Sequence, residues 1–500
     1  MSDRDDDKDD AVQDDDRDDA DRDGAVRDDD RDDAVRDDDR DDAVRDEAAD
    51  QAADDEYREL ADEVYDELLQ RLGEGSPQPR LEPVRRVVEL LGDPHRAYPI
   101  VHITGTNGKT STSRMIESLL RAHGLRTGLL TSPHLARFSE RILLDGEPIN
   151  DERLVANWRD VEPYIAMIDA SLEEADEPAI TYFEAIVILA YASFADAPVD
   201  VAVIEVGMGG EWDATNVADG QVAVFTPIAL DHEKRLGSTP AEIARTKAGI
   251  IKPLASVVSA DQDPTALAEL ERAVVLSEGT LAVEGADFGV ETTVAVGGQV
   301  ITVRGRAGTY SDVFLPLFGE HQAHNAALAI AAVESFLGDA ATALAPDLVA
   351  EGLGGATSPG RLQLVGIEPS VLVDAAHNPH GAASLARALK TYFTFDRIIA
   401  VVGILEDKDA KGMLRALNPV VDEFIITTAP SDRTTEAETL AEIAVEIAGE
   451  ERVRVEPYVR DALAAARTAA SATTKGAVVV FGSITLVGQA MEIAAAESWK

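Results

Sequence analysis

Short apolar runs of strand length alternate along most of the chain with longer stretches in which apolar residues recur at helical spacing. The apolar runs lie near residues 100–104, 127–131, 199–210, 221–232, 371–375, 398–403, 423–428, 453–457 and 477–482. This alternation predicts mostly parallel sheets whose strands are joined by right-handed helical crossovers. We therefore expect an α/β fold.

Helical and hairpin patterns fill the stretches between these runs. Residues 57–72 and 82–91 predict two amphipathic helices, and a third helix is expected from about Ser111. Asp151 is expected to cap a later helix. Residues 281–317 alternate apolar and polar positions between Gly-containing turns, which predicts antiparallel hairpins.

The first 56 residues follow neither pattern. A nine-residue unit, AVRDDDRDD, begins at Ala25 and again at Ala34, and the segment holds 29 acidic and 9 basic side chains. So few apolar residues cannot offset the entropy lost on ordering, so residues 1–56 are expected to form a disordered, solvated tail. Two globular domains are expected to follow, over residues 57–357 and 358–500.

Composition narrows the possible functions and locations. The chain has 94 acidic and 45 basic residues, a formal net charge of -49, which disfavours binding to nucleic acid or an anionic membrane. The absence of cysteine excludes disulfides, thiolate nucleophiles and Cys-based zinc sites. The longest apolar run, 185–194, is shorter than a membrane span, so we expect a cytoplasmic protein, and a monomer. The acidity outside the tail predicts a surface adapted to molar salt.

The sequence GTNGKTS at 105–111 follows the first strand and leads into a helix. Successive backbone N–H groups and the positive end of a helix dipole suit the phosphates of a nucleotide there. Lys109 adds a mobile positive charge, and Thr110 or Ser111 could place a hydroxyl on the Mg²⁺ that accompanies ATP. The spacing departs from the general phosphate loop, because only Thr106 and Asn107 separate the two glycines.

Polar residues also follow two other predicted strands. Glu205 ends one apolar run beside glycines, and Asp231 and His232 end the next. A carboxylate in an apolar strand is costly unless it is paired or bound to metal, and strand ends are where open α/β sheets place ligands. Oxygen ligands with one imidazole favour Mg²⁺ over zinc.

Seven separated motifs make the chain resemble the folylpolyglutamate synthase and dihydrofolate synthase family of ATP-dependent amide ligases, relatives of the Mur ligases. They are GTNGKTS at 105, TSPHLARFSERI at 131, TYFE at 181, EVGMGGEWDATN at 205, LDH at 230 with KAGIIKP at 247, GEHQAHNAALA at 319, and SPGR at 358 with VDAAHNP at 373. GILEDKD at 403 and FGSITLVG at 481 add support.

The resemblance implies an N-terminal P-loop ATPase domain with a parallel sheet and a small antiparallel part, and a C-terminal Rossmann-like glutamate ligase domain. In such enzymes ATP phosphorylates the carboxylate of dihydropteroate or a reduced folate, and the amine of L-glutamate then attacks the acyl phosphate. That chemistry depends on positioning and charge neutralisation. A Mur-type amino-acid ligase and a non-catalytic nucleotide-dependent scaffold are the alternatives.

The same resemblance implies roles for particular residues. ATP would be held by Gly105, Thr106, Asn107, Gly108, Lys109, Thr110, Ser111, Asn325, Arg361 and Asp374. Magnesium would be bound by Ser132, Glu205, His232 and Lys247; the folate would contact Thr181, Trp212, Asp213 and Ala214; and His377 would lie near the acyl phosphate. Lys247 would act as a carbamate, although a lysine that points away toward surface carboxylates is the alternative.

The sequence departs from the family pattern at three places. Thr110 replaces the glycine that usually follows the phosphate-loop lysine, as in Mur ligases, and the pair Glu211-Trp212 replaces Arg-Leu. Thr246 stands where a glutamate usually precedes Lys247.

Overall fold

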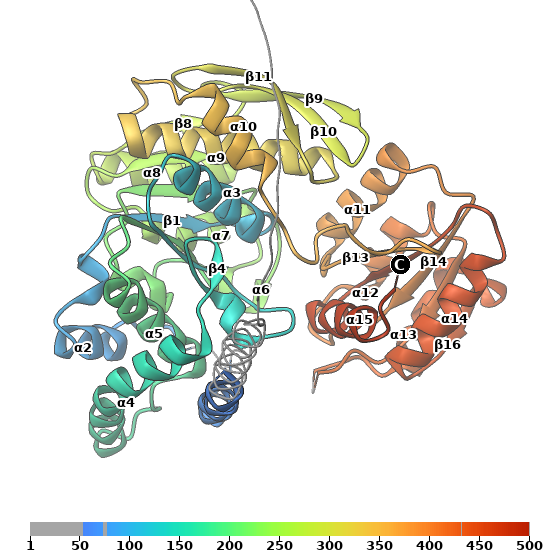
Figure 1. Cartoon of the computed structure of the whole chain (residues 1–500), viewed down its shortest axis with the longest axis horizontal. Helices are drawn as coiled ribbons and strands as arrows, with labels where there is room; N and C mark the ends of the chain where they lie inside the picture. The colour runs from blue at the N-terminus through green and yellow to red at the C-terminus, as the bar shows by residue number, and fades with distance from the viewer. Residues whose placement is uncertain (1–53, 74–77, 432, 500) are drawn as a thin grey trace, which may run out of the picture. The chain divides into compact units, whose positions relative to one another are not determined.

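The GTNGKTS turn follows an inner strand of an eight-stranded sheet (Figure 1). The computed structural model describes residues 54–73, 78–431 and 433–499, so the expected acidic tail lies outside the described residues except for its last three positions. The strand order is β4-β3-β2-β5-β1-β6-β7-β8, with β1 (Ile100–Thr104) parallel to both neighbours. The others are β2 (Thr127–Leu130), β3 (Ile142–Leu144), β4 (Glu147–Pro148), β5 (Val201–Glu205), β6 (Val222–Phe225), β7 (Ser256–Ser259) and β8 (Thr280–Val283).

Both faces of this sheet are buried, which explains why its inner strands are apolar at nearly every position. On one face Ile100 and Ile204 join a core with α2 (Glu82–Leu90), α4 (Asp151–Glu174), α5 (Tyr182–Asp196) and a helix over residues 54–69. On the other, Val101 and Ile103 join α3 (Lys109–Ala122), α9 (Glu320–Gly338) and α10 (Pro346–Gly354). The short α6 (Glu233–Leu236) precedes α7 (Pro240–Lys247), which packs with α8 (Pro264–Leu276) beside β6 and β7. No helix of the described residues is long and apolar enough to cross a bilayer.

A small antiparallel sheet, β9 (Gly289–Ala295), β10 (Gly298–Arg304) and β11 (Thr309–Leu315), shares its core with α9 and α10. The hairpins expected over residues 281–317 are therefore confirmed only from β9 onward. β8 instead pairs in parallel with β7, because its buried Ala282 belongs to the core of the large sheet.

The second α/β sheet has the order β12-β13-β17-β14-β15-β16, and β12 is its one antiparallel strand. Its strands are β12 (Gln363–Gly366), β13 (Ser370–Asp374), β14 (Arg397–Val402), β15 (Glu423–Ile426), β16 (Val453–Val455) and β17 (Gly476–Phe481). One face packs on α11 (Pro379–Tyr392), α12 (Ala410–Leu417) and α13 (Ala437–Ala448), the other on α14 (Val459–Ser471) and α15 (Ile484–Ala496) (Figure 1). The α/β class predicted from the sequence, with its two parallel sheets and small antiparallel part, is confirmed.

Two local expectations were wrong. β6 ends at Phe225, so His232 lies in a loop well beyond the strand, because Pro227 has no N–H to continue the ladder. The cap of α4 is Asn150, whose side chain accepts a hydrogen bond from the Arg153 amide at 2.8 Å. Asp151 is the first helical residue and its carboxylate faces the Arg137 guanidinium at 3.3 Å instead.

Candidate active site

The GTNGKTS turn is closed tightly by its two glycines, which both have positive φ. A Cβ at Gly108 would lie 2.7 Å from Oδ1 of Asn325, and a Cβ at Gly105 would lie 1.8 Å from the Thr226 hydroxyl. The Thr106 amide donates to the Pro227 carbonyl at 2.9 Å, so the turn is tied to the loop after β6. Only glycine permits this close approach of backbone to neighbouring side chains.

Glu205, the last residue of β5, lies directly beside this turn. Its carboxylate accepts hydrogen bonds from the Thr110 hydroxyl at 2.9 Å and the Ser132 amide at 3.3 Å, and the residue is 1% exposed. Burial raises its pKa, and the positive charge of Lys109 opposes that effect. Three of the predicted ATP and magnesium residues therefore meet at one buried carboxylate.

The structure distinguishes the two hydroxyls that the sequence left open. The Thr110 side chain points to Glu205, whereas the Ser111 hydroxyl is taken by Ser358 at 2.8 Å and by the Gln322 amide at 3.4 Å. Thr110 is therefore the one placed to contact a metal bound at Glu205, and Ser111 links α3 to the start of the second α/β sheet.

His232 is the other predicted metal ligand on the N-terminal sheet. Burial lowers its pKa to about 4, so its imidazole is neutral at physiological pH, which is the form that binds metal. Within the described residues, however, no group of three or more His, Cys, Asp or Glu side chains could hold a metal ion. The donors present fit Mg²⁺, which characteristically takes several of its ligands from water and substrate phosphates.

Lys247, at the end of α7, is buried rather than directed to the surface. It is 3% exposed, and its ammonium donates to the Gly105 carbonyl at 2.7 Å. Burial, together with the nearby charge of Lys109, lowers its pKa to about 7. The alternative in which Lys247 pairs with surface carboxylates is wrong.

The second α/β sheet contributes residues from the carboxyl end of β13. Asp374 accepts hydrogen bonds from the Leu362 amide at 2.8 Å and the Ala376 amide at 2.9 Å, which fixes both carboxylate oxygens. Burial raises the pKa of Asp374, and the charge of Arg361 opposes this. Among the described residues, Nη1 of Arg361 is buried and has no hydrogen-bond partner.

An ion pair that the sequence did not assign joins the two sheets. Lys408 donates to Asp231 at 2.9 Å, and Nε2 of His377 lies 3.5 Å from the other oxygen of the same carboxylate. Burial alone would raise the pKa of Asp231, but the hydrogen bond from His377 and the charge of Lys408 hold it well below its usual range. The motif GILEDKD at 403 contains this lysine, and it was the pattern that could have identified it.

A second missed contact lies next to this ion pair. The Asn378 amide donates to Oδ1 of Asn107 at 3.1 Å, and the Asn107 amide lies 3.1 Å from Nδ1 of His380. The GTNGKTS turn thus contacts the N-terminus of α11.

The residues predicted to contact the folate lie around the loop that follows β5. Thr181 caps α5 in a reciprocal arrangement with Glu184, and Asp213 accepts hydrogen bonds from the Met208 amide at 2.9 Å and the Thr215 amide at 3.0 Å. Trp212 and Ala214 flank Asp213 in the sequence. Local hydrogen bonds therefore hold both polar side chains in place.

One cavity of about 1740 Å³ connects all of these groups. Every residue for which the sequence predicted a catalytic, metal-binding or ligand-binding role lines it, from the GTNGKTS turn to Thr181 and Asp213 and to Arg361, Asp374 and His377. Arg361, Asp374 and His377 come at least 250 positions after the GTNGKTS turn, and only the family resemblance had placed them near it.

Two family descriptions match the chain: the Mur ligase middle domain over residues 103–333 and the Mur ligase, glutamate ligase domain over residues 360–484. The dihydrofolate synthase/folylpolyglutamate synthase of Mycobacterium tuberculosis is 44% identical over 443 residues, which are 84% of this chain and 91% of that protein. This Mycobacterium relative gives no support to a halophilic source, so adaptation to molar salt stays a prediction.

Solved structures of the same kind of enzyme also match this chain. The Mycobacterium tuberculosis folylpolyglutamate synthase complexed with ADP has a TM-score of 0.83 and 43% identity, and the match covers 88% of this chain and 99% of that one. Escherichia coli FolC in complex with DHPP and ADP has a TM-score of 0.74 and 30% identity, covering 87% and 98%. The chain belongs to the dihydrofolate synthase/folylpolyglutamate synthase family of the Mur ligases.

Proposed function

We propose that this chain is an ATP-dependent ligase that adds L-glutamate to dihydropteroate, to the glutamate tail of reduced folates, or to both, through an acyl phosphate. The observation that carries the proposal is the single cavity that joins the phosphate-binding turn, the loop around Asp213 and the residues of the second sheet. We also propose that the enzyme is monomeric and cytoplasmic.

The two parts of the chain, each built around one α/β sheet, would contribute differently to ligand binding. Residues 57–357 would bind ATP and the folate, with Lys109 and the turn amides on the phosphates, and residues 358–500 would add Arg361 and Asp374 to the ATP site. His377 would face the acyl phosphate and the incoming glutamate. Because it is already within 3.5 Å of Asp231, it is held at the junction of the two sheets.

Thr110, Ser132, Glu205, His232 and a carbamylated Lys247 would hold magnesium. The metal, when bound, neutralises charge on the phosphate oxygens. The side chains contribute by holding their donor atoms in place: Glu205 through two hydrogen bonds, and Lys247 through its contact with the Gly105 carbonyl.

The deciding experiment measures phosphate release from Mg-ATP with L-glutamate in the presence of dihydropteroate, tetrahydrofolate or a UDP-muramyl peptide. We expect release with one or both pterin compounds. Release only with the UDP-muramyl peptide would identify a Mur-type ligase. No release with any of the three would support the nucleotide-dependent scaffold.

Arg361→Ala is expected to weaken nucleotide binding and to lower turnover, each by at least about tenfold, because Nη1 of this guanidinium is buried without a hydrogen-bond partner and is available to a phosphate. Calorimetric titration with ADP and a turnover assay measure the two effects. Arg460→Ala, which removes a surface ion pair with Glu497, is the matched control. Wild-type affinity and rate in the Arg361 variant would show that the second sheet does not complete the ATP site.

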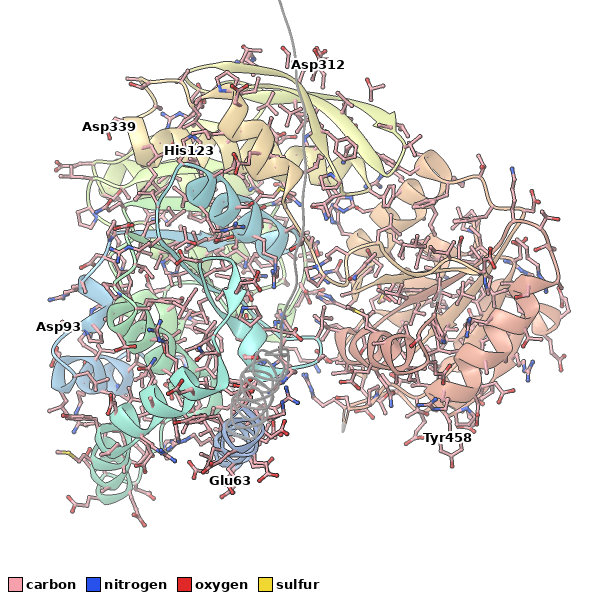
Figure 2. All side chains as sticks on the ribbon, viewed as in Figure 1. Glu63, Asp93, His123, Asp312, Asp339 and Tyr458 are labelled. Atoms are coloured by element: carbon pink, nitrogen blue, oxygen red, sulfur yellow. The ribbon has the colours of Figure 1, made fainter. Side chains whose placement is uncertain are left out.

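Raising KCl from 0.1 to 1 M is expected to increase the melting temperature by about 5 °C or more, because screening shortens the reach of repulsion between carboxylates from about 10 to about 3 Å. Figure 2 shows Glu63, Asp312 and Asp339 projecting from the surface. A chain without residues 1–55 should show the same trend and nearly unchanged turnover at saturating substrate. An unchanged or lower melting temperature would contradict the predicted salt adaptation.

A further inference from the structure

His102 is a histidine in the middle of an inner strand of the large parallel sheet. It is fully buried in β1, with β5 and β6 on either side. Its Nε2 lies 3.0 Å from the hydroxyl oxygen of Thr215, 113 positions later in the chain. Burial, with the nearby charge of Lys252, lowers its pKa to about 3, so the ring is neutral in any physiological buffer.

Thr215 connects this ring to Asp213. Its hydroxyl donates to Oδ1 of Asp213 at 2.5 Å, and its amide donates to the same oxygen at 3.0 Å. The Thr215 carbonyl accepts a hydrogen bond from the Tyr191 hydroxyl at 2.7 Å, which fixes the backbone from the other side. The carboxylate of Asp213 is thus held by a series of buried hydrogen bonds that begins at His102 inside the sheet.

The donor and the acceptor in each of these hydrogen bonds follow from the number of protons available. A hydroxyl has one proton, and an ionised carboxylate only accepts, so the Thr215 hydroxyl donates to Asp213. Thr215 must then accept from His102, which places the imidazole proton on Nε2. Nδ1 is left as a bare acceptor, and it has no hydrogen-bond partner among the described residues. This arrangement is favourable, because a buried N–H without a partner is more costly than a buried lone pair.

Asp213, which lines the cavity, keeps one acceptor position free. Oδ1 receives both hydrogen bonds from Thr215, whereas Oδ2 receives one, from the Met208 amide at 2.9 Å. A carboxylate oxygen has two lone pairs, so Oδ2 can accept one more hydrogen bond. Because Asp213 lines the cavity beside Trp212 and Ala214, the fitting partner is an N–H donor on a planar heterocycle.

We propose that His102 is a positioning residue for folate binding, which acts through the Thr215 hydroxyl to fix the carboxylate of Asp213 against the N–H groups of the pterin ring. This rests on the proposed function, in which Asp213 contacts the folate.

Four variants test this relay of hydrogen bonds from His102 through Thr215 to Asp213. Gln at position 102 places an amide nitrogen near the position of Nε2, and Asn places one near that of Nδ1. His102→Asn and Thr215→Val are expected to raise the Kd for dihydropteroate about tenfold, the effect of one lost buried hydrogen bond. His102→Gln and Thr215→Ser keep the donor or the hydroxyl and should stay within about threefold of wild type. The Kd for ADP should be unchanged in all four, since a general loss of fold would weaken both ligands.

A double-variant cycle tests the coupling directly. If His102 acts only through Thr215, adding His102→Asn to Thr215→Val should cause no further loss of dihydropteroate affinity. Equal losses in the Asn and Gln variants, additive losses in the double variant, or wild-type affinity in His102→Asn would each overturn the relay while the proposed function stands. A wild-type chain that binds neither dihydropteroate nor tetrahydrofolate would instead overturn the proposed function, and the relay with it.

Discussion

Lys109→Ala is expected to lower turnover by at least about a thousandfold, equivalent to about 4 kcal/mol of barrier, with the fold intact. The physical reason is that phosphoryl transfer depends on neutralising charge on the transferred group, and Lys109 is the cation that begins α3 at the turn. Its ammonium contacts the Thr106 carbonyl at 3.5 Å, a long contact that phosphate oxygens can replace at little cost.

The measurement is phosphate release under saturating Mg-ATP, folate and L-glutamate, paired with a thermal melt. Lys411→Ala is the control, since Lys411 is an exposed lysine of α12 that pairs with Glu446 of α13. We expect both variants to melt close to the wild-type temperature and only the Lys109 variant to lose turnover. A Lys109 variant with more than about a tenth of the wild-type rate, less than 1.4 kcal/mol of effect, would remove Lys109 from the proposed ATP site.

Lys247→Ala is expected to lose most activity as well, for a different reason. Lys247 is buried beside the phosphate-binding turn, and an ammonium there would repel the metal that the proposed site must hold. With a pKa lowered to about 7, a growing fraction of the side chain is neutral amine as pH rises through 7, and only the neutral amine reacts with carbon dioxide to form a carbamate. That reaction replaces a cation with an anionic oxygen donor, which fits Mg²⁺.

Carbon dioxide gives this prediction its test. Enzyme depleted of carbon dioxide should regain activity with bicarbonate, more completely at pH 8 than at pH 6, and ¹³C-bicarbonate should give a carbamate carbon signal that is absent in Lys247→Ala. A small carboxylic acid should partly rescue that variant. Lys252→Ala is the matched control, since Lys252 lies in the same motif and donates to the Asn216 carbonyl instead. An unmodified Lys247 in fully active, nucleotide-bound enzyme would rule the carbamate out.

The sequence by itself determined the fold class and the strands that precede the GTNGKTS turn and end at Glu205, but it placed the end of β6 too late in the chain. Apolar runs such as 100–104 and 199–210 identify strands by their length, because a parallel strand covered on both faces must be apolar at consecutive positions. The positions of the GTNGKTS turn and of Glu205 were predictable for the same local reason, since each lies within a few residues of a strand that can be identified from its own sequence.

Local patterns were insufficient where two neighbouring residues could serve equally well. Thr110 and Ser111 are adjacent hydroxyls, but one helical step rotates them by about 100°, which sends one to Glu205 and the other to Ser358. Asn150 and Asp151 are both good capping residues, and the backbone conformation at the start of α4 selects the first.

Only the tertiary structure decided which distant residues meet. The contacts of Lys247 with Gly105, of Lys408 with Asp231 and of His102 with Thr215 each span more than 100 positions. No spacing in the sequence encodes such pairs, because they follow from the order of parallel strands in a sheet and from the packing of one sheet's loops against the other's. The buried position of Lys247, and with it the lowered pKa, is a consequence of that packing. The sequence around Lys247 was therefore equally compatible with a lysine on the surface.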